Sequence, residues 1–274
     1  MSTPKYKLLV LTDFSKTCQV ALENAVNLSK IIGGSIAMMH VLKPSDIAKS
    51  ESQFTTMRSM DEMRIRKKSQ LKTIAKDVAT KFNISVTTHC VLGNLKEEVT
   101  AHIQQLRPDI IVLGKRKPKF IKLAGDSFTK FVINTFECSV LISGREKALR
   151  SSEIASLGML NTTADELPLE MANDLRKHLT NPIKRFYVYN DTAATSAKKS
   201  PEDVVTFEFE NGSNAMNHIA KYVAKNNIGL LCFNPHPKKN SKRLRSLTSN
   251  IRDAIQNIHV PILIVNNKST IQLQ

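Results

Sequence analysis

The chain has 274 residues, a length suited to two domains of ordinary size, and a net charge of +16. An apolar fraction of 41% with 23% charged residues is typical of a globular protein. There is no run of 18 apolar residues, and the N-terminus MSTPKYKLLV lacks the apolar core of a signal peptide, so we expect a cytoplasmic protein with no membrane contact.

Most of the positive charge belongs to the first half. Residues 1–150 carry 25 Lys or Arg against 13 Asp or Glu, whereas residues 151–274 carry 15 against 11. This balance favours an acidic partner such as a nucleotide, a nucleic acid or an anionic surface. The four cysteines are widely spaced, with no CxxC pair and no histidines at ligand spacing, which predicts reduced core thiols and no metal site.

The first half alternates apolar strands with helices. Strands are expected at residues 6–12, 35–42, 84–92, 110–113 and 140–142. Helices are expected at residues 16–32, about 61–82, 95–106 and from about 127. The polar, aperiodic segment 45–60 is interpreted as a loop over one edge of the sheet. Strands separated by helices specify an α/β fold with an open parallel sheet and helices on both faces.

The second half repeats this plan in a weaker form. Residues 170–177 (EMANDLRK) match 23–30 (ENAVNLSK), and residues 228–265 repeat the strand, basic loop, helix and strand of 109–143. Internal similarity of this kind predicts two copies of one domain.

The expected domains are residues 1–144 and 153–274, joined by the polar linker 145–152. Between the second and third strands of the second copy there are only residues 191–203, DTAATSAKKSPED. This segment is too short and too polar to repeat the long helix of the first copy. We therefore expect a reduced second domain with one thinly covered sheet edge.

The segment 109–143 has the form of a phosphate-binding loop. A buried strand ends at Gly114 and leads into a strongly basic loop, which is followed by a short helix. Free backbone N–H groups and the helix dipole favour an anion at such a position. Asp13 follows the first strand, and Asp13 and Gly114 face each other if the first and fourth strands are neighbours.

Four segments carry a resemblance to a known family: LLVLTDFS, MMHVL, DIIVLGKR and CSVLIS, at the first, second, fourth and fifth strands. With them the chain resembles the universal stress protein family in its tandem two-domain form. The resemblance implies an adenine nucleotide alpha hydrolase-like fold, with two five-stranded sheets of strand order 3-2-1-4-5 paired through their fifth strands. It also implies a role in survival under stress rather than a known reaction.

The resemblance further implies a residual nucleotide pocket. Asp13 would lie near a ribose, the backbone of Val41 would meet an adenine, Gly114 would open the phosphate loop, and the hydroxyl of Ser127 would donate to a phosphate. Lys115 would add positive charge to this loop.

Two positions of the loop depart from the ATP-binding pattern, since Lys117 and Asp126 stand where that pattern has glycines. Two unit charges 4 Å apart at an intermediate dielectric repel by about 4 kcal/mol, so Asp126 would oppose a phosphate there. Basic neighbours could offset this repulsion but could not restore the flexibility of glycine. We therefore expect no bound cofactor, with ATP as the alternative.

The second copy departs further from the pattern. Asn161 replaces the acid, and Asn234 and Pro237 replace the first two glycines. Any nucleotide site is therefore expected in the first domain.

The same residues also admit a structural interpretation. Asp126 and Ser127 are good helix N-caps, and Asp13 suits a turn before a helix. His40 ends a core strand and is expected to be structural.

No GxGxxG, GxxxxGK[ST], GxSxG or HExxH motif occurs, so we expect a protein that is not an enzyme. The leading hypothesis is a stress-response protein that binds a small anionic ligand or an unknown protein partner, with ATP binding weak or lost. The alternatives are an adenine-nucleotide sensor that uses the first domain, and a binder of polyanions or nucleic acid through the basic loops 115–122 and 238–245.

The fifth strands are expected to carry a pairing surface. Residues 140–143 and 262–265 should pair either with each other inside the chain or with a second molecule.

Overall fold

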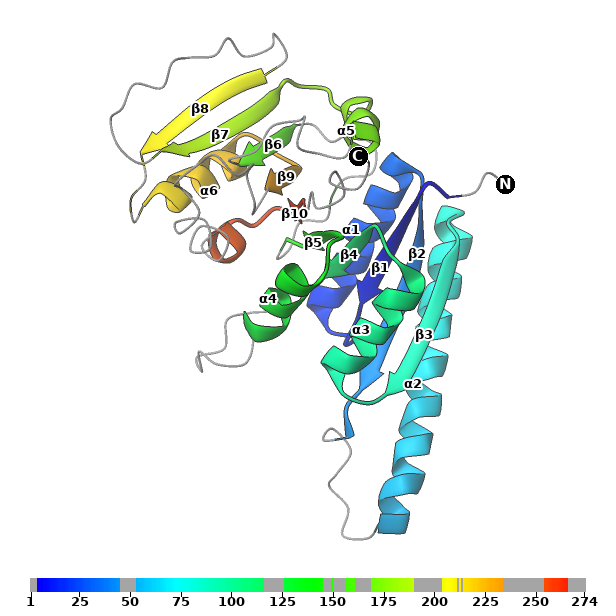
Figure 1. Ribbon diagram of the computed structural model, residues 1–274. Helices are drawn as coiled ribbons and strands as arrows, with labels where there is room; N and C mark the ends of the chain where they lie inside the picture. The colour runs from blue at the N-terminus through cyan, green and yellow to red at the C-terminus, as the bar shows by residue number, and fades with distance from the viewer. Residues whose placement is uncertain are drawn as a thin grey trace, which may run out of the picture.

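The computed structural model is a ten-stranded sheet with helices on both faces (Figure 1). This arrangement confirms the predicted α/β fold. The structure describes residues 4–44, 53–115, 126–144, 149, 156–160, 169–189, 204–210, 212, 214–233 and 254–265.

The first half supplies five parallel strands in the order β3-β2-β1-β4-β5, as the resemblance implies. Its elements are β1 (Tyr6–Leu11), α1 (Lys16–Ile32), β2 (Gly34–Leu42), α2 (Gln53–Phe82), β3 (Val86–Leu92), α3 (Leu95–Leu106), β4 (Ile110–Leu113), α4 (Asp126–Thr135) and β5 (Ser139–Ile142).

The second half has the same strand order, β8-β7-β6-β9-β10. Its elements are β6 (Leu157–Leu160), α5 (Leu169–Arg176), β7 (Ile183–Tyr189), β8 (Val204–Glu210), α6 (Ala215–Lys225), β9 (Leu230–Phe233) and β10 (Ile262–Ile264), with a helical turn at 254–257 before β10. The connection 191–203, expected to leave a sheet edge thinly covered, lies outside the described residues.

The two halves join through their fifth strands. β5 and β10 pair antiparallel, with Leu141 opposite Leu263 and Ile142 opposite Ile262, and all four side chains are buried. Of the two pairings that the sequence leaves open, the structure shows the one inside the chain. The result is one continuous sheet in place of two separate ones.

Local signals set the ends of several helices. α1 ends at Gly33, whose φ of 75° is easily reached by glycine and whose N–H donates to the carbonyl of Ser29. α3 begins after Asn94, whose side chain accepts a hydrogen bond from the Lys96 N–H at 3.0 Å.

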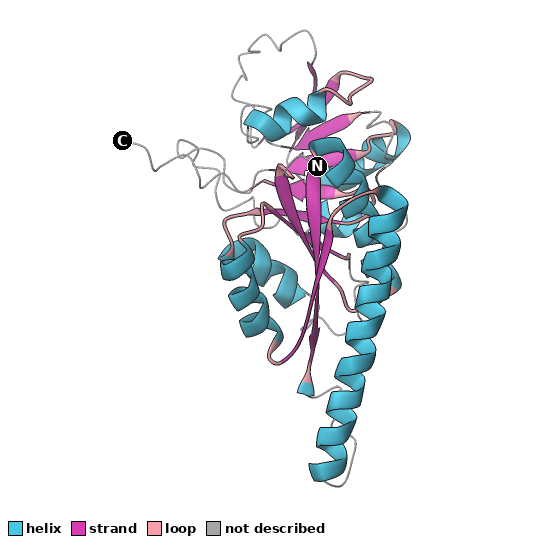
Figure 2. Cartoon of the chain, turned by 90° about the vertical axis from the view of Figure 1, so that its right-hand side faces the viewer, coloured by secondary structure: helices cyan, strands magenta, loops and turns pink. Residues whose placement is uncertain are grey.

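α2 is longer than the sequence predicts. It begins at Gln53, so the expectation of a loop throughout 45–60 is wrong for residues 53–60. Among the described side chains of α2, Leu71 is the first that is buried. The sequence before it has no apolar periodicity that would predict a helix. The N-terminal part of the helix extends past the carboxyl ends of the strands (Figure 2).

Two apolar layers hold the sheet between its helices. One layer contains Leu28 of α1, Leu71 of α2 and Leu175 of α5, and the other contains Ile103 of α3 and Ile219 of α6. Each layer draws residues from both halves, so the halves share their cores. Among the described residues, no helix combines the length and the apolar character needed to cross a membrane.

Candidate functional site

A cavity of about 340 Å³ lies at the carboxyl ends of β1, β2 and β4. In this strand order the chain leaves β1 toward one face of the sheet and enters β4 from the other, which is where open α/β sheets usually bind ligands. The lining residues are Leu11, Thr12, Asp13, Thr17, Cys18, Met39, His40, Val41, Leu42, Lys43, Met63, Lys67, Leu95, Val99, Leu113, Gly114, Phe128 and Thr129.

The structure brings together three of the five predicted site residues, because Asp13, Val41 and Gly114 all line this cavity. Ser127 is the second residue of α4, directly before the lining residues Phe128 and Thr129. Its side chain is not among the described ones, so its predicted hydrogen bond to a phosphate stays a prediction.

Gly114 has a packing role that needs no ligand. A Cβ atom on this residue would lie 3.0 Å from the carbonyl carbon and oxygen of Thr17 and 3.1 Å from the backbone nitrogen of Cys18. The end of β4 therefore touches the first turn of α1, and a side chain at residue 114 would force the two apart.

Asp13 organises the turn between β1 and α1. Its Oδ1 accepts hydrogen bonds from the Ser15 N–H at 3.0 Å and from the Cys18 thiol at 3.1 Å. A carboxylate at this position also suits the positive end of the α1 dipole. The turn role expected for Asp13 is thus present, and the same residue borders the cavity.

His40 joins the ends of two strands. Its Nδ1 donates to the Thr12 carbonyl at 2.8 Å, and its ring packs against Phe14 with centroids 4.5 Å apart. This structural role agrees with the sequence-based expectation. Phe14 adopts a φ of 62°, and the Lys67 ammonium lies 4.6 Å from the centroid of its ring.

The contribution of α2 to the cavity was missed by the sequence interpretation. Met63 and Lys67 of this helix line the cavity from the edge of the sheet. The signal is the four-residue step from Met63 through Lys67 to the buried Leu71, which places the three side chains on one helix face.

The cavity wall combines an apolar surface with few charges. Leu11, Met39, Val41, Val99 and Leu113 supply apolar side chains. Asp13 is the carboxylate in the lining, and Lys43 and Lys67 are the ammonium groups. Such a wall suits a ligand with a flat apolar part and a few hydroxyl or anionic groups. Within the described ranges no group of three metal-ligating side chains occurs.

The model of the universal stress protein family matches residues 6–143, just over half of the chain. The chain belongs to the universal stress protein family. No curated protein matches it in sequence.

Two solved structures show how far the fold is shared. A universal stress protein from Archaeoglobus fulgidus superimposes with a TM-score of 0.73 at 17% identity, covering 96% of this chain and 97% of that one. A functionally unknown protein from Pseudomonas aeruginosa gives 0.57 at 10% identity, covering 95% and 92%. At these identities the likeness concerns the fold over almost the whole chain.

The side chain of Lys115 points toward the second half of this universal stress protein. It is 5% exposed, its Nζ donates to the Ile258 carbonyl at 2.6 Å, and its N–H donates to Ser143 Oγ at 3.2 Å. Lys115 is therefore not among the residues that line the cavity. β4 neighbours β5, which pairs with β10, so a side chain at residue 115 meets the chain segment before β10. The rest of the basic loop, 116–125, lies outside the described residues.

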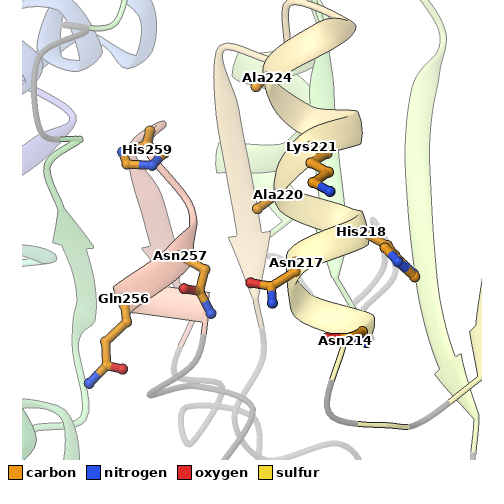
Figure 3. A pocket seen from close by; sticks show the side chains of 9 residues that line it. All are labelled: Asn214, Asn217, His218, Ala220, Lys221, Ala224, Gln256, Asn257 and His259. Atoms are coloured by element: carbon orange, nitrogen blue, oxygen red, sulfur yellow. The ribbon is translucent and has the colours of Figure 1, made fainter.

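The second half of the universal stress protein contains a separate groove of about 580 Å³ between α6 and the turn 254–257 (Figure 3). Asn217 of α6 extends toward Asn257, and the small side chains of Ala220 and Ala224 lie above it in the view. The other lining residues are Asn214, His218, Lys221, Gln256 and His259. No sequence motif pointed to this groove. Asn161, Asn234, Pro237 and the second basic loop lie outside the described residues.

Proposed function

We propose that this universal stress protein acts in the stress response without catalysis, by binding a small ligand in the first-half cavity or a protein partner. Membership in the family supports a role in the stress response. The observation that carries the binding proposal is the cavity that joins Asp13, Val41 and Gly114 at the junction of β1, β2 and β4.

The reactive side chains of the cavity support a non-enzymatic role. Burial raises the pKa of the Cys18 thiol, which keeps it protonated and makes it a poor nucleophile. The same thiol donates to Asp13, and the Nδ1 of His40 donates to the Thr12 carbonyl. These groups hold the end of the sheet together, which leaves them poorly placed for acid–base chemistry.

The ligand proposed is an adenosine-type compound held mainly through its base and sugar. Val41 and the apolar wall would face the base, and Asp13 would accept hydrogen bonds from the sugar hydroxyls. The phosphate end is poorer, because the Lys115 ammonium is engaged by Ile258 and because Lys117 and Asp126 replace glycines of the ATP-binding pattern. Adenosine and ATP are therefore expected to bind with similar, weak affinity.

Titration calorimetry of the full chain with adenosine and with ATP tests this proposal. We expect dissociation constants that differ by less than about tenfold, and weaker binding of both compounds by Asp13→Asn. Asp77→Asn, which removes an exposed carboxylate of α2 outside the cavity lining, is the matched control. A micromolar ATP site that disappears in Ser127→Ala would favour the nucleotide sensor instead.

A second measurement addresses catalysis directly. Release of phosphate from ATP should equal that of buffer and should not change in Asp13→Asn. Turnover that this variant abolishes would contradict the non-enzymatic proposal.

A further inference from the structure

Four exposed cations follow one another along α2. Arg64, Lys68, Lys72 and Lys76 follow one another at steps of four residues, and all four side chains are exposed. Each step of four residues advances about 6 Å along the helix axis and turns by about 40°, so the row is about 18 Å long and winds around about a third of the helix circumference. Between residues 58 and 82 the helix carries eight Lys or Arg against three Asp or Glu.

The row is nearly unpaired. Arg64 lies 3.7 Å from Asp61, whereas no ion pair within the described ranges involves Lys68, Lys72 or Lys76. Like charges four residues apart destabilise a helix, so helix stability does not account for this arrangement. The row is better explained by an anionic partner.

The surface around the row is open. α2 forms the outer layer at the β3 side of the sheet, and its N-terminal turns extend beyond the strands (Figures 1 and 2). Ile65, next to the row, is 65% exposed. The apolar side of the helix, with Leu71, Ala75 and Val78, is buried against the sheet and is not available to a partner.

The charge and burial of α2 discriminate among possible partners. A second copy of the chain is disfavoured because both surfaces carry excess positive charge. A membrane surface requires an apolar helix face that can insert, and that face of α2 is already buried. Single strands are bound through aromatic side chains that stack on bases, and residues 58–81 contain none.

A duplex backbone fits the row best. Double-stranded DNA presents about one negative charge per 1.7 Å of axis, and point charges on a helix can neutralise phosphates without reading bases. We propose that the row Arg64, Lys68, Lys72 and Lys76 binds the phosphodiester backbone of duplex nucleic acid without sequence specificity. This interaction is independent of the first-half cavity and of the ligand proposed there.

Fluorescence anisotropy with a short labelled DNA duplex of arbitrary sequence tests the proposal. Four phosphate contacts predict that log K falls against log salt concentration with a slope of about −3.6, measured between about 50 and 200 mM salt. Lys72→Gln/Lys76→Gln should reduce the steepness by about 2 and weaken binding at low salt.

Lys81→Gln is the matched control for a single neutralisation such as Lys72→Gln. Lys81 lies on the same helix outside the row, with its ammonium 5.3 Å from the Phe82 ring centroid. Its replacement should leave the slope unchanged, whereas Lys72→Gln should reduce the steepness by about 1. Circular dichroism checks that each variant is folded.

Three results would overturn the proposal. The first is an unchanged slope in the Lys72/Lys76 variant, which would move any DNA contact elsewhere, including to the basic loops. The second is tighter binding to a single strand than to the duplex. The third is binding to phosphatidylserine vesicles without binding to the duplex.

Discussion

The ammonium group of Lys115 donates to the carbonyl oxygen of Ile258 at 2.6 Å, across the junction of the two halves. Lys115 directly follows Gly114, which lines the cavity. The second half therefore holds the first residue of the loop that would surround a ligand. In the universal stress protein described here, the cavity and the junction share adjacent residues.

Loss of this hydrogen bond should weaken the junction. Lys115→Ala leaves a buried carbonyl with one donor fewer and removes packed methylene groups, so we expect a loss of about 1–3 kcal/mol in the free energy of unfolding. Lys115→Met, which keeps most of the packing, should lose less. Guanidinium denaturation followed by circular dichroism measures both variants.

The control for this comparison is Lys130→Ala on α4, where the side chain is exposed. Its effect should stay within about 0.5 kcal/mol, as is usual for surface positions. If Lys115→Ala and Lys130→Ala unfold at the same denaturant concentration, the Lys115 bond makes no contribution to stability.

The β5–β10 pairing predicts a monomer at low concentration. The fifth strands are consumed inside the chain, with Val140 opposite Ile264, so that surface is not available to a second molecule. Light scattering coupled to size exclusion should give the mass of one chain, 30.6 kDa, at all low micromolar loadings. Twice this mass, independent of dilution, would indicate a dimer formed through another surface.

The thiols should differ in reactivity. Burial raises the pKa of Cys138 to about 11 and that of Cys232 to about 12. At pH 8 about one thiol in a thousand is then ionised at Cys138, and fewer are at Cys232. Burial also raises the pKa of Cys90, an effect that Lys68 and Arg64 partly offset, and its side chain is partly exposed.

Cys90 should therefore react first with iodoacetamide, Cys138 more slowly because its pKa is about 11, and the buried Cys232 only after denaturation. Peptide mass spectrometry over a time course assigns each rate. Cys90→Ser should remove the fast phase and leave the slow ones unchanged. Equal rates at Cys90 and Cys232 in the folded protein would be inconsistent with the buried position of Cys232.

Local signals made much of the first half predictable. The boundaries expected for residues 16–32 and 95–106 agree with α1 and α3, because Gly33 and the Asn94 cap mark helix ends chemically. The start of α2 was missed because the sequence before Leu71 lacks the apolar periodicity that reveals a helix.

The sequence predicts those parts of the candidate site that depend on strand order. It does not predict those that depend on contacts with the other half of the chain. Asp13, Val41 and Gly114 meet because the carboxyl ends of neighbouring parallel strands meet at one edge of the sheet. The direction of Lys115 is set by Ile258 in the other half, 143 residues away. No local pattern encodes such a contact, and the same holds for the choice between two possible partners of the fifth strands.

The stacked pair His89 and His102 should make stability depend on pH. Their ring centroids lie 4.3 Å apart at an angle of 8°, where β3 and α3 meet. Burial, followed by the nearby His89, lowers the pKa of His102 from its usual value of 6.5. Among the described residues its Nδ1 has no hydrogen-bond partner that would compensate for burial.

The sign follows from proton uptake. Below about pH 6.5 the unfolded chain protonates His102 while the folded protein does not, so unfolding takes up a proton. The free energy of unfolding therefore decreases as the pH is lowered. The loss continues until the pH reaches the lowered pKa of the folded protein. Above about pH 7 both states are neutral, and the contribution of His102 to stability is complete.

Urea denaturation at about pH 7.5 and 5.5 measures this dependence. The wild-type midpoint should fall more between these values than that of His102→Gln, which cannot bind the proton. His218→Gln, at an exposed position on α6, should keep the wild-type dependence. If the midpoint falls equally in the wild type and in His102→Gln, groups other than His102 cause the pH dependence of stability.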